Sequence, residues 1–264
     1  IVEENEEALT EERPSLEDAE LYDRIMASRI QRAIEKVTED TENYDFNLAI
    51  DEIDRLLSKL YWYEQQEGRE EVLSHGIKTL LKLLSPYAPH ITEELWDGIG
   101  KEAFMLEEDW PEPSEDLIDE EAEEIDSYFD RVSSDIREIT EMIEGEPEKV
   151  KIIKASDWKY KAGENILEAI QDTKDVGEVM DKVLDGELQQ YAQQINDEVV
   201  SAVENPGKYR RDFSGKALEQ KALELNEERF ESEFGVEVVV ENESKSGEGK
   251  ASRAQPGRPA IVVE

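Results

Sequence analysis

The sequence has no cysteine and only two histidines, His75 and His90, among its 264 residues. The absence of cysteine excludes disulfides, thiolate zinc sites and cysteine nucleophiles. Two histidines are too few for a histidine-rich metal site, and no Asp-x-Asp-x-Asp-Gly loop for calcium is present. We therefore expect no metal site and no cofactor-binding residue in this chain.

Long apolar runs are also missing. No stretch approaches 18 uncharged apolar residues, so we expect no membrane span. The chain begins at Ile1 with a polar, acidic run, without the basic start and apolar core of a signal peptide. The simplest interpretation is a cytoplasmic segment cut from a longer protein.

Catalytic motifs are absent as well. Gly98-Ile99-Gly100 follows a helical pattern and lacks the third glycine of a dinucleotide loop. Gly215-Lys216 lacks the earlier glycine and the following Ser or Thr of a phosphate loop. His90 has no nucleophile near it in sequence, and we interpret it as a residue that packs at a helix start. We expect no catalytic residue here.

Positive charge is scarce: 69 Asp and Glu stand against 30 Lys and Arg, a formal net charge of −39. A disordered acidic tail would be poor in apolar residues, whereas 38% of this chain is hydrophobic. The pattern favours a folded protein with an acidic surface. At molar salt the Debye length is about 3 Å, which screens the self-repulsion of such a surface. We expect a halophilic origin, with a mesophilic acidic scaffold as the alternative.

Apolar residues recur with helical spacing in the first half of the chain. The periodic segments are Leu16–Val37, Asp45–Gln65, Arg69–Leu84, a short helix from Pro89 that Gly98 and Gly100 end, and Asp119–Ile143. Short connections between long helices predict an antiparallel bundle.

The pattern changes after Pro147. Strands are predicted at 149–155, 235–241 and 260–263, helices at 157–171, 175–184, 187–204 and 216–233, and a Ser/Gly/Lys-rich loop at 243–257. The predicted fold class is therefore mostly α: an antiparallel helix bundle (1–146) followed by a small α/β domain (147–264).

Three basic clusters, at 149–161, 208–216 and 245–258, interrupt the acidic background of the second domain. Lys and Arg position nucleic acids through phosphate contacts. The predicted RNA contacts are Lys151, Lys154, Lys159, Lys161, Arg210, Arg211, Lys250 and Arg253. The neighbouring aromatic residues Trp158, Tyr160, Tyr209 and Phe213 would stack on splayed bases. The alternative is a set of internal salt bridges, with Trp158 and Phe213 in the core.

Two further motifs carry a family resemblance. Residues 84–96 read Leu-Ser-Pro-Tyr-Ala-Pro-His-Ile-Thr-Glu-Glu-Leu-Trp, and Trp110-Pro111 follows them. This combination resembles the anticodon-binding helical domain of the class I aminoacyl-tRNA synthetases for isoleucine, valine and leucine. Lys149 to Ile153, Trp158 to Ala162 and the last residues, Arg253 to Glu264, resemble the C-terminal domain of archaeal-type leucyl enzymes.

The resemblance implies the tRNA-binding C-terminal portion of a leucine–tRNA ligase that contacts the tRNA body and the long variable arm. Its partners would be leucine tRNA and the catalytic and editing domains of the same polypeptide, with no membrane, and the enzyme would be monomeric. ATP and magnesium belong to the catalytic domain, whose signature motifs this chain lacks. The resemblance also implies variable-arm contacts from the terminal segment, at Arg258, Pro259, Ile261, Val262 and Val263.

Alternatives remain open. Ile261 to Val263 could form an ordinary edge strand instead of an RNA contact. The chain could come from an isoleucyl or valyl enzyme, or it could be an acidic helical module that binds protein partners. The concentration of Lys and Arg in one domain argues against a protein scaffold, and the coding sequence upstream of Ile1 would decide most of the rest.

Overall fold

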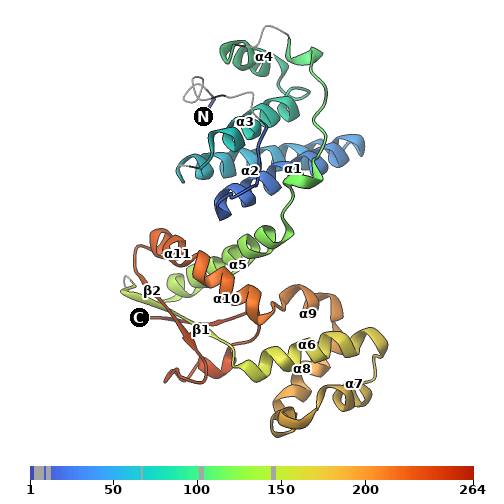
Figure 1. Cartoon of the computed structure of the whole chain (residues 1–264), viewed down its shortest axis with the longest axis vertical. Helices are drawn as coiled ribbons and strands as arrows, with labels where there is room; N and C mark the ends of the chain where they lie inside the picture. The colour runs from blue at the N-terminus through green and yellow to red at the C-terminus, as the bar shows by residue number, and fades with distance from the viewer. Residues whose placement is uncertain (3–8, 10–12, 67, 101–103, 144–146) are drawn as a thin grey trace. The chain divides into compact units, whose positions relative to one another are not determined.

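The computed structural model of this chain describes residues 1–2, 9, 13–66, 68–100, 104–143 and 147–264. They form two compact units, which we call unit 1 (Ile1–Glu124) and unit 2 (Ile125–Glu264). Figure 1 labels their helices and strands.

Unit 1 is helical. Its elements are α1 (Leu21–Glu42), α2 (Phe46–Glu64), α3 (Glu70–Leu84), α4 (Pro89–Gly98), the short 3₁₀ turns η2 (Met105–Glu107) and η3 (Glu115–Leu117), and the first residues of α5 (Glu120–Met142). Helices α1, α2 and α3 pack against one another around a core that includes Ile30, Leu60 and Leu80. These residues come from the apolar stripes that the sequence shows, because a helix with one apolar face must bury that face against a neighbour.

One buried carboxylate joins the three packed helices. Asp23, at the start of α1, is 2% exposed. It accepts hydrogen bonds from the backbone N–H of Glu20 at 3.1 Å, from the Tyr63 hydroxyl of α2 at 2.5 Å and from the backbone N–H of Arg69 at 3.0 Å, just before α3. Both oxygens of Asp23 accept hydrogen bonds, and Nε of Arg69 lies 3.4 Å from one of them, so the charge is tolerated in the core.

Helix α5 belongs to both units. At its N-terminal end Glu123 pairs with Arg32 of α1, and Asp119, just before the helix, pairs with Arg24 of α1. From Ile125 onward its apolar stripe packs within unit 2, where the ring of Phe129 lies 4.6 Å from that of Phe230. The packing therefore divides the chain into compact units between Glu124 and Ile125. The domain boundary between residues 146 and 147 that the sequence suggests stays a prediction.

Unit 2 combines a small sheet with several short helices. Its elements after α5 are β1 (Lys149–Lys154), α6 (Asp157–Asp172), α7 (Val176–Val183), η4 (Gly186–Tyr191), α8 (Ala192–Glu204), α9 (Pro206–Asp212), α10 (Lys216–Leu225), α11 (Glu227–Phe234), β2 (Glu237–Asn242), η5 (Ala251–Arg253) and β3 (Ala260–Val263). The strand order is β2-β1-β3, with β1 parallel to β2 and antiparallel to β3. A second core, around Ile166, Val179 and Val199, lies among α6, α7 and α8.

The predicted fold class, a helical bundle followed by a small α/β domain, is confirmed. Three details differ from the expectations. Helix α9 was not predicted, the segment 187–204 starts as the 3₁₀ turn η4, and the segment 216–233 is broken at Asn226. The side-chain amide of Asn226 donates to the carbonyl of Ala222 at 2.8 Å, which ends α10 before α11 begins.

Within the described residues, no helix is both long and apolar enough to cross a membrane.

Candidate nucleic-acid interface

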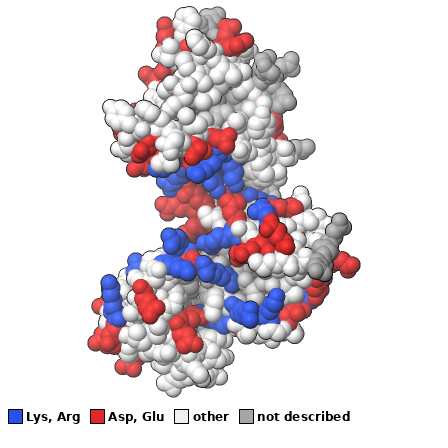
Figure 2. Space-filling view, turned by 180° about the vertical axis from the view of Figure 1, so that it is seen from behind, with Lys and Arg blue, Asp and Glu red and all other residues white. Residues whose placement is uncertain are grey.

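Lys and Arg side chains gather on one face of unit 2 (Figure 2). All three basic clusters contribute to the wall of a pocket of about 450 Å³, which we call the tail pocket. Its lining residues are Trp158, Lys159, Gln194, Asp197, Glu198, Ser201, Asn205, Lys208, Tyr209, Asp212, Phe213, Ser252, Gln255, Pro256 and Arg258. Segments separated by about a hundred residues in sequence thus meet at one site.

The chain turns back at 255–258 to form one wall of this pocket. Gln255 and Arg258 exchange two backbone hydrogen bonds, of 2.9 and 2.8 Å, and Gly257 lies at the turn with φ of 81°. A Cβ atom on Gly257 would come within 2.2 Å of the carbonyl oxygen of Asp212 and 2.7 Å of the backbone nitrogen of Ser214. Only glycine allows the turn to lie this close to the end of α9.

The buried carboxylate of Glu219 holds the same turn through a hydrogen bond from Gly257. It is 0% exposed and accepts hydrogen bonds from the Tyr128 hydroxyl at 2.8 Å, the Tyr160 hydroxyl at 2.9 Å and the Gly257 N–H at 2.9 Å. Burial raises the pKa of Glu219, and the three donors oppose that rise. One side chain therefore joins α5, α6, α10 and the terminal turn.

Lys159 anchors the other end of the terminal loop. Its side chain is 5% exposed. The ammonium donates to a carboxylate oxygen of Glu243 at 3.0 Å and to the carbonyls of Ser252 and Ala254 at 2.9 and 2.7 Å. A lysine has three N–H donors, and all three are used here. The expected phosphate contact by Lys159 is thus corrected: this lysine is a structural anchor.

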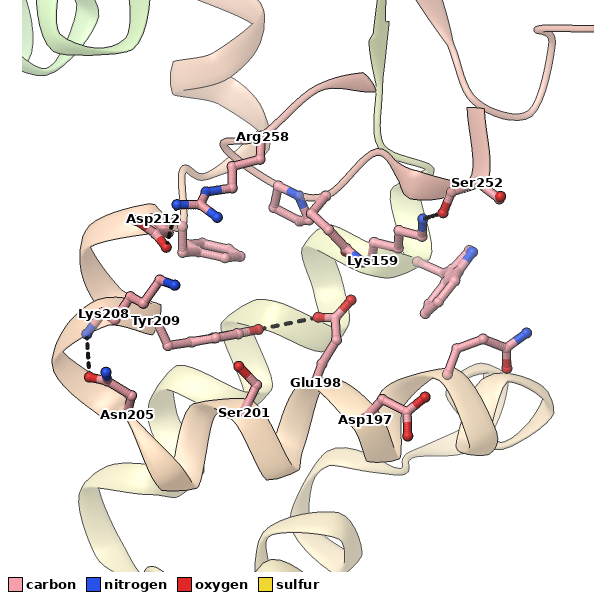
Figure 3. A pocket seen from close by; sticks show the side chains of 15 residues that line it. Lys159, Asp197, Glu198, Ser201, Asn205, Lys208, Tyr209, Asp212, Ser252 and Arg258 are labelled. Carbon is pink, nitrogen blue, oxygen red and sulfur yellow. Dashed lines mark hydrogen bonds and ion pairs between the residues drawn. The ribbon is translucent and has the colours of Figure 1, made fainter. Parts of the chain in front are cut away.

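The interior of the pocket has an acidic centre. Glu198 of α8 accepts a hydrogen bond from the Tyr209 hydroxyl of α9 at 3.4 Å, and a second from the amide of Gln255. Figure 3 shows the Tyr209 ring directed at the Glu198 carboxylate, with Lys159 on the opposite side. Burial raises the pKa of both Glu198 and Tyr209.

The cations of the three basic clusters, which include the predicted contacts, divide into two sets. Lys151 pairs with Glu248 at 2.8 Å and Glu264 at 2.5 Å, and Lys161 pairs with Asp185 at 3.1 Å. Arg258 pairs with Asp212 at 2.8 Å, although its side chain keeps 55% exposure. Internal pairing, the alternative that the sequence left open, therefore describes part of the basic clusters.

The second set makes no side-chain hydrogen bond or ion pair with any described residue. We call these residues the unpaired set: Lys154, Lys208, Arg210, Arg211, Lys245, Lys250 and Arg253. All except Lys154 are exposed. Lys154 lies close enough to Glu219 for their charges to interact. The other six are exposed and are the candidates for phosphate contacts.

The terminal residues that were expected to contact RNA differ in their exposure. Pro259 and Ile261 are buried, and Ile261, on the edge strand β3, pairs with Ile152 of the central strand β1. Their side chains have no free surface for RNA, so the expected side-chain contacts by these two residues are corrected to an edge strand. Val262 and Val263 are partly exposed, and their role in tRNA contact stays a prediction.

Of the aromatic residues expected to stack on bases, two have other partners. Tyr160 is 3% exposed and donates to Glu219. The indole of Trp158 stacks on the Tyr191 ring with centroids 4.1 Å apart. Tyr209 and Phe213 line the tail pocket with rings 25° from parallel.

Sequence reasoning missed α9, which carries much of the pocket. A signal was present in Asn205-Pro206, since the Asn205 side chain accepts from the N–H of Lys208 at 3.2 Å and proline suits the first helical turn. Glu198 and Gln255 were missed as well, and nothing local distinguishes Glu198 from the other acidic residues. The described residues contain no group of three or more acidic or histidine side chains that could hold a metal ion.

Comparison with known proteins shows the family of the chain. The profile of the family described as "Anticodon-binding domain of tRNA ligase" matches residues 23–157. The leucine–tRNA ligase of Aeropyrum pernix is 31% identical over 96% of this chain and 26% of its own length. That of Halobacterium salinarum is 30% identical over 93% of this chain and 27% of its own length. The chain thus spans about a quarter of the length of these relatives.

Among solved structures, a crystal structure of a ternary complex of a leucyl-tRNA synthetase from Agrobacterium radiobacter K84 with tRNA and LeuAMS is 27% identical. The similarity covers 58% of this chain and 17% of that one, with a TM-score of 0.41.

Proposed function

Because the chain belongs to the family of anticodon-binding domains of tRNA ligases, we propose that it is the tRNA-binding portion of a leucine–tRNA ligase. In this proposal unit 2 contacts leucine tRNA, including its long variable arm. The catalytic and editing domains would lie elsewhere in the same cytoplasmic polypeptide, where ATP and magnesium would act. The enzyme would work as a monomer.

The observation that carries the proposal is the extent of the similarity to leucine–tRNA ligases. The family profile ends at residue 157, whereas the similarity to the Aeropyrum enzyme covers 96% of the chain and therefore includes most of unit 2. This extent favours a leucyl enzyme over the isoleucyl and valyl alternatives.

The geometry of unit 2 supports an RNA partner independently. Arg210 and Arg211 project from a single short helix, α9, and Lys250 and Arg253 lie in the loop that forms another wall of the tail pocket. A protein whose net charge is −39 gains nothing in solubility from unpaired cations concentrated on one face. Phosphate groups are the natural ligand for such a set.

We also propose that the source is a halophile. The net charge of −39 is far outside the range suited to dilute buffer, and a Halobacterium enzyme is among the relatives. In molar salt, counterion release contributes little to RNA affinity. Hydrogen bonds, stacking and shape must then carry more of the recognition.

The proposal is tested by binding of fluorescently labelled tRNA to this chain in molar KCl, followed by anisotropy. We expect leucine tRNA to bind more tightly than a tRNA with a short variable arm, and a leucine tRNA with a shortened arm to lose that advantage. Equal affinity for all three RNAs would contradict a role in leucine tRNA recognition.

A further inference from the structure

The tail pocket has a chemical character that phosphate binding alone does not require. Its interior carries an acceptor, the Glu198 carboxylate, while the cations Lys208 and Arg258 belong to exposed parts of its wall. Figure 3 shows Lys208 and Arg258 on the side of Asp212, and Glu198 farther along α8 toward Lys159. A ligand that fits must therefore combine hydrogen-bond donors on one edge with a negative charge at some distance.

The acceptor side of the pocket has unused capacity. An ionised carboxylate has about four acceptor sites on its two oxygens. Among the described residues, Glu198 accepts from the Tyr209 hydroxyl, at a long 3.4 Å, and from the amide of Gln255, which leaves sites for further donors. The amide oxygen of Gln255, on the same wall, is buried and has no hydrogen-bond partner among the described residues. A buried acceptor without a donor is unfavourable. A ligand with several hydrogen-bond donors beside Gln255 would supply the donor that this amide oxygen lacks.

Flat apolar surfaces complete the pocket. The rings of Tyr209 and Phe213 lie 6.4 Å apart between centroids and nearly parallel. The ring of Phe213, which follows α9, packs tightly against Gly163 of α6, where a Cβ atom would come within 2.2 Å of it. The volume of about 450 Å³ is in the range of small-ligand pockets, about 300–1,000 Å³. An unstacked nucleobase has the required shape, with aromatic side chains for its faces.

We propose that the tail pocket binds an unstacked guanine base, with Glu198 accepting from its Watson–Crick edge and Lys208 and Arg258 contacting the attached phosphate. Guanine is the standard base that presents two adjacent N–H donors, N1–H and the 2-amino group, which match the two oxygens of a carboxylate. Adenine and cytosine place an acceptor beside their amino group, and uracil offers one N–H. The inference rests on the proposed function where it takes the guanine to come from tRNA.

The first experiment varies the ligand, which leaves the protein fold untouched. Saturation-transfer NMR of the chain in molar KCl would measure binding of GMP, IMP, AMP and UMP. We expect GMP to bind best, and IMP, which lacks the 2-amino group, to bind roughly tenfold or more weakly. AMP and UMP should bind no better than IMP. Equal binding of all four nucleotides, or no detectable binding of GMP, would overturn the proposal.

The second experiment varies the protein with a matched pair of substitutions on α8. Glu198→Gln should abolish the preference for GMP over IMP, because an amide offers one acceptor in place of two. Glu204→Gln removes the same charge at the exposed end of the helix, outside the pocket, and should leave the preference intact. Tyr209→Ala should weaken the binding of all four nucleotides, because the stacking surface is lost. Far-UV circular dichroism checks that each variant is folded.

Competition with leucine tRNA separates the two sources of guanine. If the tRNA displaces bound GMP, a guanine of the RNA occupies the pocket. If GMP is bound selectively but the tRNA does not displace it, the pocket is a site for free guanine nucleotides. If wild type binds leucine tRNA with no guanine preference at the pocket, this inference fails and the proposed function stands. If GMP is bound selectively but leucine tRNA does not bind at all, the proposed function fails instead.

Discussion

Unit 1 and unit 2 use their basic side chains differently. Unit 1 contains 37 acidic and 11 basic residues, and unit 2 contains 32 and 19, so the first unit is the more acidic although it is the shorter. In unit 1, Arg24 pairs with Asp119 at 2.6 Å and Arg32 with Glu123 at 2.8 Å. Every described Lys and Arg of this unit has an interaction of some kind within the chain.

Unit 2 contains the unpaired set. Unit 2 has more Lys and Arg residues than unit 1, yet some of those in its three basic clusters form no ion pair with a described residue. In an acidic protein, a cation without a carboxylate partner is the exception, because carboxylates are available almost everywhere. Under the proposed function, the position of the unpaired cations, and not the net charge, predicts the surface that contacts RNA.

The largest effect should come from a paired cation of unit 2. Lys159→Met removes the ammonium that joins Glu243 to the carbonyls of Ser252 and Ala254, and leaves all three acceptors in a buried site. Breaking a buried pair in this way costs about 3–5 kcal/mol. Denaturant unfolding in molar KCl would measure the loss. The control, Lys161→Met, breaks an exposed pair with Asp185 and should change stability by roughly 1 kcal/mol or less.

The same variant also tests whether Lys159 has a structural role or contacts RNA. If Lys159→Met were as stable as wild type but bound leucine tRNA poorly, Lys159 would belong with the RNA contacts and the structural role assigned to it would be wrong.

A second prediction concerns a weakly basic residue of unit 1. The pKa of His75 is lowered to about 4. Burial of the ring is the main cause, and the positive charges of Arg13, Lys78 and Lys82 add to it. The Gln31 amide donates to its Nε2 at 3.2 Å and so favours the neutral ring. The unfolded chain binds a proton near pH 6.5 and the folded chain near pH 4, so stability falls as the pH drops through this window, by up to about 3 kcal/mol.

Chemical denaturation between pH 7 and pH 4 measures this effect as a difference between variants. His75→Gln should lose less stability across the window than wild type, while His90→Gln, at an exposed position, should behave as wild type does. Identical pH profiles for His75→Gln and wild type would show that His75 does not resist protonation.

A third prediction tests the terminal turn. Gly257→Ala would place a methyl group 2.2 Å from the Asp212 carbonyl, at a φ of 81°, and should destabilise unit 2 by roughly 2 kcal/mol. Gly249→Ala is the matched control in the preceding loop, since nothing lies within 4 Å of its Cβ position. Equal melting temperatures for the two variants would mean that the turn does not need to lie against α9.

Much of this architecture could be predicted from the sequence because periodicity reports which face of an element is buried. The bounds of α2, α3 and β3 lie within a residue or two of the predicted segments. Periodicity does not report which partner covers that face, and the stripe of α5 was assigned to the helical bundle although it packs in unit 2 from Ile125 onward.

The candidate site was harder to predict. The basic clusters identified the correct region of the chain, but composition cannot separate Lys159, which is 4% exposed, from Lys250, which is exposed. Glu198 and Glu219 become distinctive only when distant segments surround them. The side-chain contacts of a terminal strand likewise depend on its register, which places Ile261 opposite Ile152 in the sheet.

The smallest predicted effect is a loss of leucine tRNA affinity when two cations of the unpaired set are removed. Arg210→Gln combined with Arg211→Gln removes two exposed guanidinium groups of α9 and should weaken leucine tRNA binding roughly tenfold, since each exposed charge contact contributes up to about 1 kcal/mol. The control pair, Arg13→Gln with Arg55→Gln, removes the same charge from exposed ion pairs of unit 1. An equal loss in both pairs would mean that only net charge matters.

The most direct test of the different roles of the two units is lysine footprinting. Brief acetylation of the chain in molar KCl, with and without leucine tRNA, followed by mass spectrometry, measures the protection of each lysine. We predict that the RNA protects Lys208, Lys245 and Lys250 of unit 2 and leaves Lys36 and Lys82 of unit 1 unchanged. Protection of the unit 1 lysines, with unit 2 equally reactive in both samples, would contradict the account.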